Sequence, residues 1–288
     1  MGVIIDGKAI AVAIKNDIKQ RLDVIKLKTK LEPCLAVVLV GEDPASAIYV
    51  SSKAKACGEI GFNTLPLIKP SNITQQELED LILSLNKDKS VHGILVQLPL
   101  PSQINKDKII ELIDPLKDVD GFHHENAGKL FCGDVENSLF PCTPSGCMYV
   151  INQYLGSIAG KNVCIVGASN IVGKPMALMC INAGATVSVC NKKTKNLEYF
   201  TKEADVIIVA AGKPNLIKAE IVKDGVFIVD VGINRLENGK IVGDCDFEGL
   251  KSKASFITPV PGGIGPLTIA FLLENTFKAF CRSLNGSE

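Results

Sequence analysis

The sequence of 288 residues has no excess of charge, since its 31 basic residues are balanced by 31 acidic ones. Without a basic excess it has no electrostatic basis for binding nucleic acid or an anionic membrane surface. It also lacks an apolar run of the roughly 18–20 residues that a transmembrane helix needs, and its N-terminus has no signal-peptide pattern. We therefore expect a cytoplasmic protein that binds neither nucleic acid nor membranes.

Closely spaced metal ligands are also missing. The chain has three histidines, and none of its ten cysteines forms a CxxC pair. Zinc sites depend on such spacings, so we expect no metal site. Most of the cysteines fall inside apolar segments, where a free thiol behaves as a small hydrophobic side chain. We expect them to be buried free thiols.

Apolar runs that resemble strands alternate with helical stretches in the first third of the chain. The pattern predicts strands at 34–41, 62–69 and 91–101, with helices at 46–61 and 74–88 between them. Gly61 is expected to stop the first helix, and Thr74 with Glu77 to open the second through a capping box. Consecutive βαβ units imply a parallel sheet with right-handed crossovers.

The middle of the chain, 114–146, is rich in Gly, Pro, Asp and Asn and predicts long functional loops, with a domain junction near 141–145. A second alternating series follows. It predicts strands at 161–167, 185–190, 204–212, 225–232 and 255–260, with helices at 168–184 and 265–284. The fold class is therefore α/β, with two parallel-sheet domains and a cleft between them.

A glycine turn in the second series is typical of dinucleotide binding. Gly167 ends a strand and Gly173 opens the following helix, whose N-terminus favours a pyrophosphate. The spacing is G-x-x-x-x-x-G rather than G-x-G-x-x-G, so a plain connection remains an alternative. The next strand ends in Asn191, Lys192 and Lys193 instead of an acidic residue. A cation there suits a 2′-phosphate and favours NADP, unless the lysines are simply solvated.

Tyr49 and Lys53 lie four residues apart, so on a helix they share one face. The spacing is that of the YxxxK pair of short-chain dehydrogenases. There, however, the pair follows the glycine turn in the same domain, whereas here it precedes the turn and lies in the other βαβ series. That order excludes the short-chain family. A proton-transfer lysine and an ordinary surface lysine both remain open on this spacing.

Polar side chains follow the third predicted strand. Gln97 lies near its carboxyl end and Asp120 in the loop beyond, where ligands of parallel sheets bind. An amide and a carboxylate can recognise the N–H and C=O groups of a heterocycle. Asp118 and Asp120 could equally be turn residues, and His123 and His124 are more typical of a solvent-facing loop than of catalysis.

The run of proline and glycine at 258–268 predicts a shaped turn that brings backbone close to a flat ligand, or else a rigid linker. Together with it, several segments lie in collinear order over nearly the whole chain: YVSSKAK, GILVQLPLP, KDVDGFH, PCTPSG, GASNIVGKP, DVGINR and ITPVPGGIGPLT. In this combination the sequence resembles the bifunctional methylenetetrahydrofolate dehydrogenase/methenyltetrahydrofolate cyclohydrolase family. The resemblance implies a homodimer that oxidises 5,10-methylenetetrahydrofolate with NADP and hydrolyses the product to 10-formyltetrahydrofolate.

The resemblance also implies roles for particular residues. Lys53 matches the catalytic lysine, Tyr49 its partner in the folate site, Gln97 the residue beside it, and Asp120 the carboxylate that holds the pterin. The expected substrate contacts further include Leu98, Pro261, Gly262 and Gly263, and the expected cofactor contacts are Gly167, Ala168, Ser169, Lys192 and Ile233. Many members carry Arg where this chain has Ala168, which leaves the 2′-phosphate to Lys192 and Lys193.

The family likeness divides the chain into a folate-binding catalytic domain, 1–142 plus a last helix at 267–288 that folds back on it, and a Rossmann-like NADP domain at 143–266. Two other readings remain: a non-catalytic folate- or nucleotide-binding protein, and a dehydrogenase without the cyclohydrolase step that uses NAD. The joint presence of Lys53, Gln97 and Asp120 argues against the first.

Overall fold

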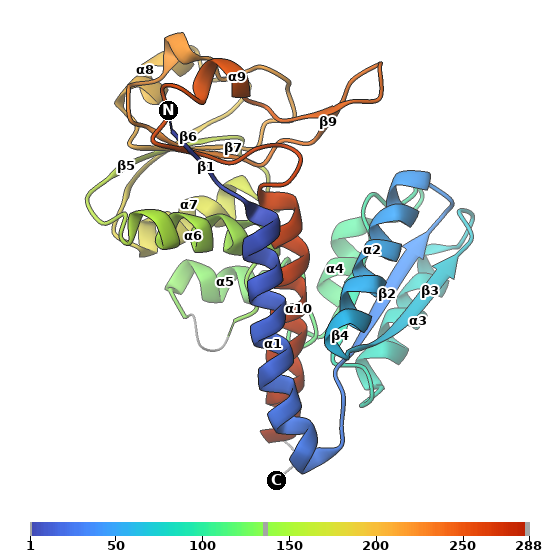
Figure 1. Cartoon of the computed structure of the whole chain (residues 1–288). Helices are drawn as coiled ribbons and strands as arrows, with labels where there is room; N and C mark the ends of the chain where they lie inside the picture. The colour runs from blue at the N-terminus through green and yellow to red at the C-terminus, as the bar shows by residue number, and fades with distance from the viewer. Residues whose placement is uncertain (1, 135–137, 286–288) are drawn as a thin grey trace. The chain divides into compact units, whose positions relative to one another are not determined.

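The computed structural model describes residues 2–134 and 138–285, which form two compact units (Figure 1). The six-stranded unit comprises residues 2–12, 130–133 and 143–268. The three-stranded unit comprises residues 13–129, 269–285 and the described part of 134–142. The α/β class with parallel sheets is confirmed.

The three-stranded unit is a parallel sheet of β2 (Cys34–Val40), β3 (Asn63–Lys69) and β4 (Gly93–Val96), in the order β3-β2-β4. Helices α2 (Pro44–Ile60) and α3 (Gln75–Lys87) cover opposite faces (Figure 1). The even-numbered residues of β2, such as Val38, pack against α3 and α4 (Lys106–Leu112). Burial on both faces explains why β2 is a continuous apolar run.

The ends of these helices follow from side-chain and glycine caps. The box of Thr74 and Glu77 is present: the Thr74 N–H donates to Glu77 Oε2 at 2.8 Å and the Glu77 N–H to Thr74 Oγ1 at 3.2 Å. Gly61 ends α2 with φ of +82°, a conformation that glycine adopts without strain. Helix α2 begins at Pro44, two residues before the predicted start, because the Asp43 carboxylate accepts the Ser46 N–H at 2.8 Å.

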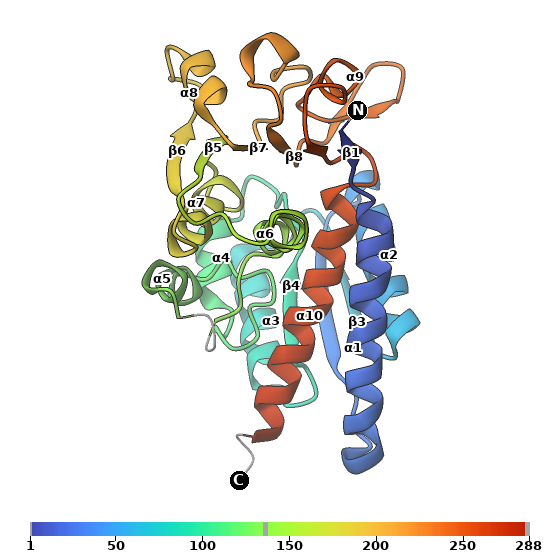
Figure 2. The same cartoon turned by 60° about the vertical axis from the view of Figure 1, so that its left-hand side comes forward.

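Helices α1 (Gly7–Thr29) and α10 (Ile264–Asn285) run side by side in both views (Figures 1 and 2). Within the three-stranded unit, Arg21 of α1 pairs with Glu274 of α10, with Nη1 to Oε1 at 3.2 Å. The same guanidinium lies 4.9 Å from the centre of the Phe277 ring. A charge pair and a cation–π contact thus join the two helices.

The prediction of long loops at 114–146 is wrong in part. Helix α5 spans His124–Cys132, and α6 (Cys142–Leu155) begins inside the same segment. In α5, Glu125 and Lys129 form an i, i+4 ion pair at 2.6 Å, and Leu130 is buried. The many Gly, Asn and Asp residues conceal these short helices, whose stability comes from such contacts rather than from helix propensity.

The six-stranded unit contains an all-parallel sheet of β1 (Val3–Ile4), β5 (Asn162–Val166), β6 (Thr186–Cys190), β7 (Val206–Val209), β8 (Phe227–Asp230) and β11 (Phe256–Ile257), in the order β1-β11-β8-β7-β5-β6. Helices α6 and α7 (Gly173–Asn182) lie on one face, and α8 (Leu197–Glu203) and α9 (Phe247–Leu250) on the other (Figure 2). The unit also contains the short helix η1 (Ala219–Ile221) and a separate antiparallel pair of β9 (Asn234–Arg235) and β10 (Ile241–Val242).

The N-terminus differs from the expected domain of 1–142. Strand β1 pairs with β11, with the Val3 N–H donating to Ser255 O at 2.8 Å and the Ile5 N–H to Ile257 O at 2.9 Å. A side chain on Gly2 would meet the Ala254 carbonyl oxygen at 2.0 Å. Residues 2–12 therefore belong with the six-stranded unit. A two-residue strand offers no alternation from which a sequence pattern could predict it.

Seven of the ten cysteines are buried free thiols, as predicted, while Cys34 and Cys281 are partly accessible and Cys132 is exposed. Burial raises the thiol pKa values of Cys147 and Cys164 well above their usual range. Across the described residues, none of the helices combines the length and apolar character required to span a membrane.

The amphipathic helix α3 gives a direct test of this packing. Ile82 is fully buried and Leu83 is 40% exposed on the same helix. We expect Ile82→Ala to lower the free energy of unfolding by about 2–5 kcal/mol because it leaves a cavity, and Leu83→Ala to change it by less than about 0.5 kcal/mol. Urea unfolding followed by circular dichroism measures both, and equal losses would contradict the assigned orientation of α3.

Candidate active site

Lys53, Gln97 and Asp120 lie close together in the three-stranded unit. Lys53 is carried by α2, Gln97 follows β4, and Asp120 lies in the loop that a bridge between Ile94 and Asp118 joins to β4. The Lys53 ammonium donates a hydrogen bond from Nζ to Gln97 Oε1 at 2.9 Å. The group is at the carboxyl end of a parallel strand, where ligands of this fold class bind.

Gln97 is held in one orientation by the backbone. Its N–H donates to Val38 O at 2.9 Å, which extends the ladder of β4 by one residue. Its side-chain Nε2 donates to Leu98 O at 2.8 Å. The amide nitrogen is thus engaged, and the amide oxygen faces Lys53. Leu98 contributes its carbonyl to this arrangement and is itself partly accessible.

Tyr49 lies one helical turn before Lys53 on α2 and exposes 43% of its surface. Lys53 is less exposed than the tyrosine. The i, i+4 spacing on a helix places the two side chains on one face. A ligand next to Lys53 can therefore pack against an aromatic ring that the fold leaves accessible.

The carboxyl group of Asp120 has a pKa that its surroundings shift. Burial raises the pKa of its carboxyl to about 6, the nearby Lys53 ammonium opposes this rise, and the Asp118 carboxylate adds to it. The side chain nevertheless remains partly accessible. A carboxyl group with a pKa near 6 changes its protonation state close to neutral pH, and carboxyl groups shifted in this way are concentrated at functional sites.

Asp118 differs from Asp120 in its hydrogen bonds. Its Oδ2 accepts the His123 N–H at 2.9 Å and the Asn126 side-chain amide at 3.0 Å, and its side chain is 1% exposed. Burial raises its pKa as well. Of the two readings that the sequence left open for these aspartates, the turn role fits Asp118.

His123 and His124 point toward α4. The ring Nε2 of His123 lies 3.1 Å from the Glu111 carbonyl oxygen, and Nδ1 of His124 lies 3.0 Å from Glu111 Oε2. The side chain of His124 is 79% exposed. These contacts with Glu111 tie both rings to the helix rather than to Lys53. No catalytic role is assigned to them.

In the six-stranded unit the predicted cofactor residues follow the carboxyl ends of three parallel strands, β5, β6 and β8, and the segment after β7, which was not predicted, lies between them. Lys192 follows β6, Gly167 to Ser169 follow β5, residues 210–213 follow β7, and Ile233 follows β8. Since the strands are parallel and adjacent, these segments line one edge of the sheet. Ile233 is 55% exposed there. This edge is the usual location of a dinucleotide site.

The glycine turn after β5 is shaped so that backbone packs on backbone. Gly167 has φ of +126°, and a Cβ there would meet the Ala210 oxygen at 2.2 Å. A Cβ on Gly173 would meet the Gly167 oxygen at 2.0 Å. Ser169 Oγ accepts the Val172 N–H at 3.2 Å just before α7. A turn with glycine at both ends, before the N-terminus of a ten-residue helix, fits a dinucleotide pyrophosphate.

The loop after β6 carries two lysines, Lys192 and Lys193, and has no acidic residue at the strand end. The Asn191 side chain accepts the Lys193 N–H at 2.9 Å, and the Asn191 N–H donates to Thr194 Oγ1 at 2.9 Å. Lys192 and Lys193 are exposed, and within the described ranges neither forms an ion pair. Two unengaged cations at this strand end fit a 2′-phosphate.

Two buried aspartates that sequence reasoning did not identify support this edge. Asp244 accepts the N–H groups of three residues after β7, at 2.6 Å for Ala211, 2.9 Å for Gly212 and 2.9 Å for Lys213. Asp230 ends β8 and accepts the N–H groups of Gly232, Asp244 and Cys245. Both are almost fully buried. Asp230 lies at the end of an apolar run and Asp244 follows a glycine, and neither context distinguishes these residues from ordinary strand-end or turn aspartates.

The turn that contains Pro261, Gly262 and Gly263 lies in the six-stranded unit. Gly262 has φ of +105°, and a Cβ on Gly263 would meet the Pro259 oxygen at 2.5 Å. The Val260–Pro261 peptide is cis. The turn is therefore as tightly shaped as its composition predicts. Its role in substrate binding stays a prediction.

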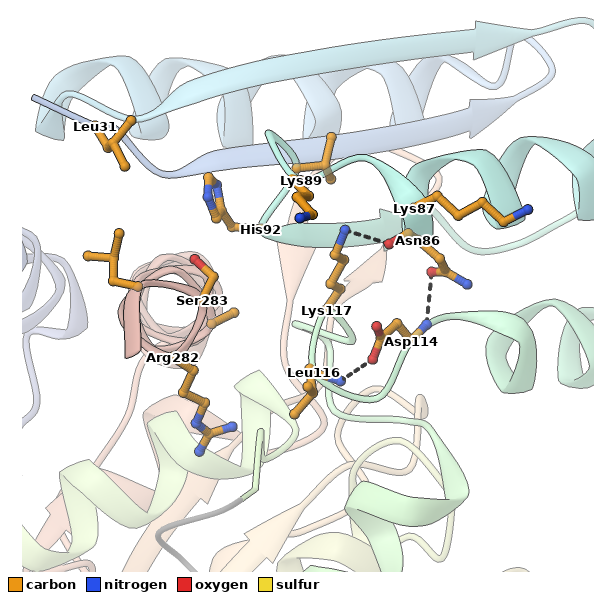
Figure 3. A pocket seen from close by; sticks show the side chains of 13 residues that line it. Leu31, Asn86, Lys87, Lys89, His92, Asp114, Leu116, Lys117, Arg282 and Ser283 are labelled. Carbon is orange, nitrogen blue, oxygen red and sulfur yellow. Dashed lines mark hydrogen bonds between the residues drawn. The ribbon is translucent and has the colours of Figure 1, made fainter. Parts of the chain in front are cut away.

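The three-stranded unit also has a pocket of about 840 Å³ at the opposite, amino end of its strands (Figure 3). His92, which precedes β4, lines it and accepts the Cys34 N–H through Nδ1 at 3.0 Å. Lys117 also lines it, but its ammonium donates to the carbonyls of Leu85, Asn86 and Asp88 at the end of α3. The polar groups of this pocket therefore bond to the protein itself: Lys117 caps the end of α3, and His92 joins the start of β4 to the start of β2.

Metal ligands do not gather elsewhere in the part of the chain that the structure describes, since no group of three His, Cys, Asp or Glu side chains there could hold a metal ion.

Comparison with known proteins gives matches over both halves of the chain. Residues 5–120 match the model of the tetrahydrofolate dehydrogenase/cyclohydrolase catalytic domain, and residues 141–284 match that of the tetrahydrofolate dehydrogenase/cyclohydrolase NAD(P)-binding domain. A bifunctional protein FolD of Campylobacter jejuni is 57% identical over 282 residues, covering 98% of this chain and 99% of the relative. A bifunctional protein FolD of Sulfurihydrogenibium is 53% identical over 283 residues, with the same coverage.

Solved structures agree with these matches. The crystal structure of the bifunctional methylenetetrahydrofolate dehydrogenase/cyclohydrolase FolD from Campylobacter jejuni superposes with a TM-score of 0.95 at 56% identity, covering 98% of this chain and all of that one. The Trypanosoma brucei enzyme of the same kind, complexed with NADP cofactor and inhibitor, superposes with a TM-score of 0.93 at 34% identity, covering 98% of each chain.

The raised pKa of Asp120 gives a test of the site that needs no ligand. Between the usual value of 3.8 and about 6, the folded chain holds a proton on Asp120 that the unfolded chain has lost, so the free energy of unfolding falls as pH rises across this window. Asp120→Asn removes this loss. We expect the variant to be more stable than the wild type at pH 7 and similar to it near pH 4, measured by urea unfolding. A gain of the same size at both pH values would contradict the assignment.

Proposed function

Because the chain belongs to the tetrahydrofolate dehydrogenase/cyclohydrolase family, we propose that it oxidises 5,10-methylenetetrahydrofolate with NADP and then hydrolyses the 5,10-methenyl product to 10-formyltetrahydrofolate. The observation that carries the proposal is the Lys53–Gln97 hydrogen bond beside the titratable Asp120 carboxyl. These groups lie in the half of the chain that matches the catalytic-domain model. They supply an ammonium group and a carboxyl group in one place, as acid–base chemistry on a folate requires.

The first reaction removes a hydride from the methylene carbon and leaves a methenyl cation. No proton needs to move in that step, so the protein contributes chiefly by holding the substrate in place. We assign Asp120 to the pterin, Tyr49 to packing against the folate, and Leu98 to the backbone contacts beside Gln97. The negative charge of Asp120 also offsets the positive charges of Lys53 and of the cation.

The second reaction adds water to the methenyl carbon and then breaks one carbon–nitrogen bond of the ring, with release of a proton. Lys53 is the group we assign to these proton transfers. Lys53 donates one of its N–H groups to Gln97 Oε1. The Gln97 amide is held in this orientation because its nitrogen donates to Leu98 O. The remaining N–H directions of Lys53 are left for water and substrate.

NADP, when bound, accepts the hydride. The residues that would hold it are the turn Gly167, Ala168 and Ser169 with the start of α7 for the pyrophosphate, Lys192 for the 2′-phosphate, and the backbone at Ile233. The close packing of Gly167 against Ala210 supports the first of these, and the exposed lysines after β6 support the second. Pro261, Gly262 and Gly263 are proposed to contact the folate through backbone.

We also propose that the protein works as a homodimer in the cytoplasm, without nucleic acid or membrane partners. Ten free thiols suit a reducing compartment. In the six-stranded unit, β6 is an edge strand that carries the 42% exposed Val189. An exposed edge strand is a natural place for a second copy to pair. Light scattering during size-exclusion chromatography measures the mass of the assembly.

A two-step assay tests the whole function. The wild-type protein is given 5,10-methylenetetrahydrofolate with NADP or NAD, and the methenyl product is followed by its near-ultraviolet absorbance. We expect NADP to be preferred and the methenyl signal to stay low because the product is hydrolysed. Lasting accumulation would indicate a dehydrogenase without the hydrolase step. A complete absence of methenyl and reduced cofactor would indicate a binding protein.

Lys53→Met separates the two reactions. The substitution keeps the length of the side chain but removes its ability to transfer protons, so we expect cyclohydrolase activity to fall by about 10² or more while the folate still binds. Hydrolysis of added methenyltetrahydrofolate and folate binding by fluorescence measure the two effects. Lys55→Met, an exposed lysine on the same helix, is the matched control. Undiminished hydrolysis in the Lys53 variant would remove Lys53 from the mechanism.

Replacing both Lys192 and Lys193 by alanine tests cofactor choice. Loss of the cations that face a 2′-phosphate should raise KM for NADP by about tenfold or more, since a charged hydrogen bond is worth about 1.5–3 kcal/mol. KM for NAD, which lacks that phosphate, should stay the same. Steady-state dehydrogenase rates with each cofactor give the comparison. An equal rise for both cofactors would point to a loop defect rather than to phosphate binding.

A further inference from the structure

Two buried side chains donate hydrogen bonds to the carbonyl of the peptide bond that precedes Asp120. The carbonyl of Val119 belongs to the peptide bond that leads into Asp120. It accepts a hydrogen bond from the side-chain Nδ2 of Asn275 at 2.8 Å and from the Cys142 thiol at 3.2 Å. Asn275 is 4% exposed and Cys142 is 3% exposed. The plane of this peptide is therefore fixed before the chain reaches the Asp120 side chain.

The residue after Asp120 is fixed from the other side. Gly121 has φ of +73°, and a Cβ there would meet the Phe140 carbonyl carbon at 2.5 Å and the Leu139 oxygen at 2.6 Å. Its backbone thus lies directly on the segment 139–141. The same Asn275 amide donates to the Phe140 oxygen at 2.8 Å. One amide group of α10 consequently joins the peptide before Asp120 to the segment that Gly121 packs against.

The arrangement uses up the donor capacity of the Asn275 amide nitrogen, which has two N–H groups and bonds two carbonyls. A buried carbonyl that loses its donor incurs a desolvation penalty, so the loop would shift to recover a partner. A shift of the Val119–Asp120 peptide moves the carboxylate directly. The helix on which Asn275 lies is otherwise distant in sequence from this loop.

We propose that Asn275, together with Cys142, is a positioning residue that aims the Asp120 carboxylate at the folate. This inference rests on the proposed function, in which Asp120 contacts the pterin. Asn275 is buried and its amide nitrogen bonds backbone carbonyls, so in this proposal it acts through the loop rather than on a ligand. Its effect is therefore confined to folate recognition, in both the dehydrogenase and the cyclohydrolase reactions, and leaves recognition of NADP unchanged.

The adjacent residue on α10 provides a matched control. Thr276 is fully buried, and its hydroxyl donates to Leu272 O at 2.8 Å within the same helix. Thr276→Val removes a buried hydrogen bond from the helix and leaves the Asp120 loop intact. Any general consequence of weakening α10 appears in this variant as well as in Asn275→Leu.

The experiment compares Asn275→Leu, Thr276→Val and Asp120→Asn in the full-length protein. We expect Asn275→Leu to raise KM for methylenetetrahydrofolate by about tenfold, the effect of about 1.4 kcal/mol, while KM for NADP stays within about twofold of wild type. KM for methenyltetrahydrofolate in the hydrolase assay should rise by a similar factor. Thr276→Val should leave all three KM values unchanged, with thermal unfolding recorded for each variant.

The outcomes separate the inference from the proposed function. If Asp120→Asn leaves the folate KM unchanged, Asp120 does not hold the pterin, and the positioning inference falls with it. The positioning inference alone is overturned if Asp120→Asn raises the folate KM but Asn275→Leu does not. It is also overturned if Asn275→Leu raises the KM for folate and the KM for NADP equally. If Asn275→Leu does not fold, Cys142→Ala removes a donor to the same Val119 oxygen, and Cys142→Ser restores one. The inference then requires a raised folate KM in Cys142→Ala and its recovery in Cys142→Ser.

Discussion

The catalytic half of this protein depends on placing a carboxyl group below the surface, beside an ammonium group. The Asp120 carboxyl is partly desolvated, which raises its pKa to about 6, and the nearby Lys53 ammonium limits that rise. Keeping such a group in place costs free energy that the surrounding contacts must supply. The buried Asp118, Asn126 and Asn275 side chains, which hold the backbone around it, provide those contacts.

In the half that matches the NAD(P)-binding domain, the edge of the sheet is shaped mainly by close packing and hydrogen bonding of the backbone. The turn after β5 has glycine where a Cβ would strike a neighbouring carbonyl, at Gly167 and again at Gly173. Two buried aspartates then collect the N–H groups of the loops after β7 and β8. Each carboxylate replaces several water molecules at once, so irregular loops stay ordered at the edge of the sheet.

Much of this architecture was predictable because it depends on local or periodic signals. Continuous apolar runs mark β2, β7 and β8, and the Thr74–Glu77 box marks the start of α3. The pairing of β1 was not predictable, since Val3 and Ile4 carry no alternation and their partners lie some 250 residues away in sequence. Helix α5 was missed because its composition resembles a loop.

The candidate site divides in the same way. Lys53, Gln97 and Asp120 were predicted from their places on a helix, at a strand end and in a loop, and from the family resemblance, and the structure brings them together. Asn275, Asp230 and Asp244 were not, because their importance lies in which backbone groups they bond. A buried asparagine in an apolar helix looks like any other until the carbonyls of Val119 and Phe140 are seen beside it. Contacts between distant segments are what a single sequence does not reveal.

The most direct test of the electrostatic account is to titrate the Asp120 carboxyl itself, by carbon-13 NMR of aspartate-labelled protein in the wild type and in Lys53→Met. The account predicts a pKa of about 6 in the wild type, because burial raises it, and a higher pKa when the Lys53 ammonium is removed. A pKa near the usual 3.8 of aspartate in the wild type, or one unaffected by loss of Lys53, would contradict it.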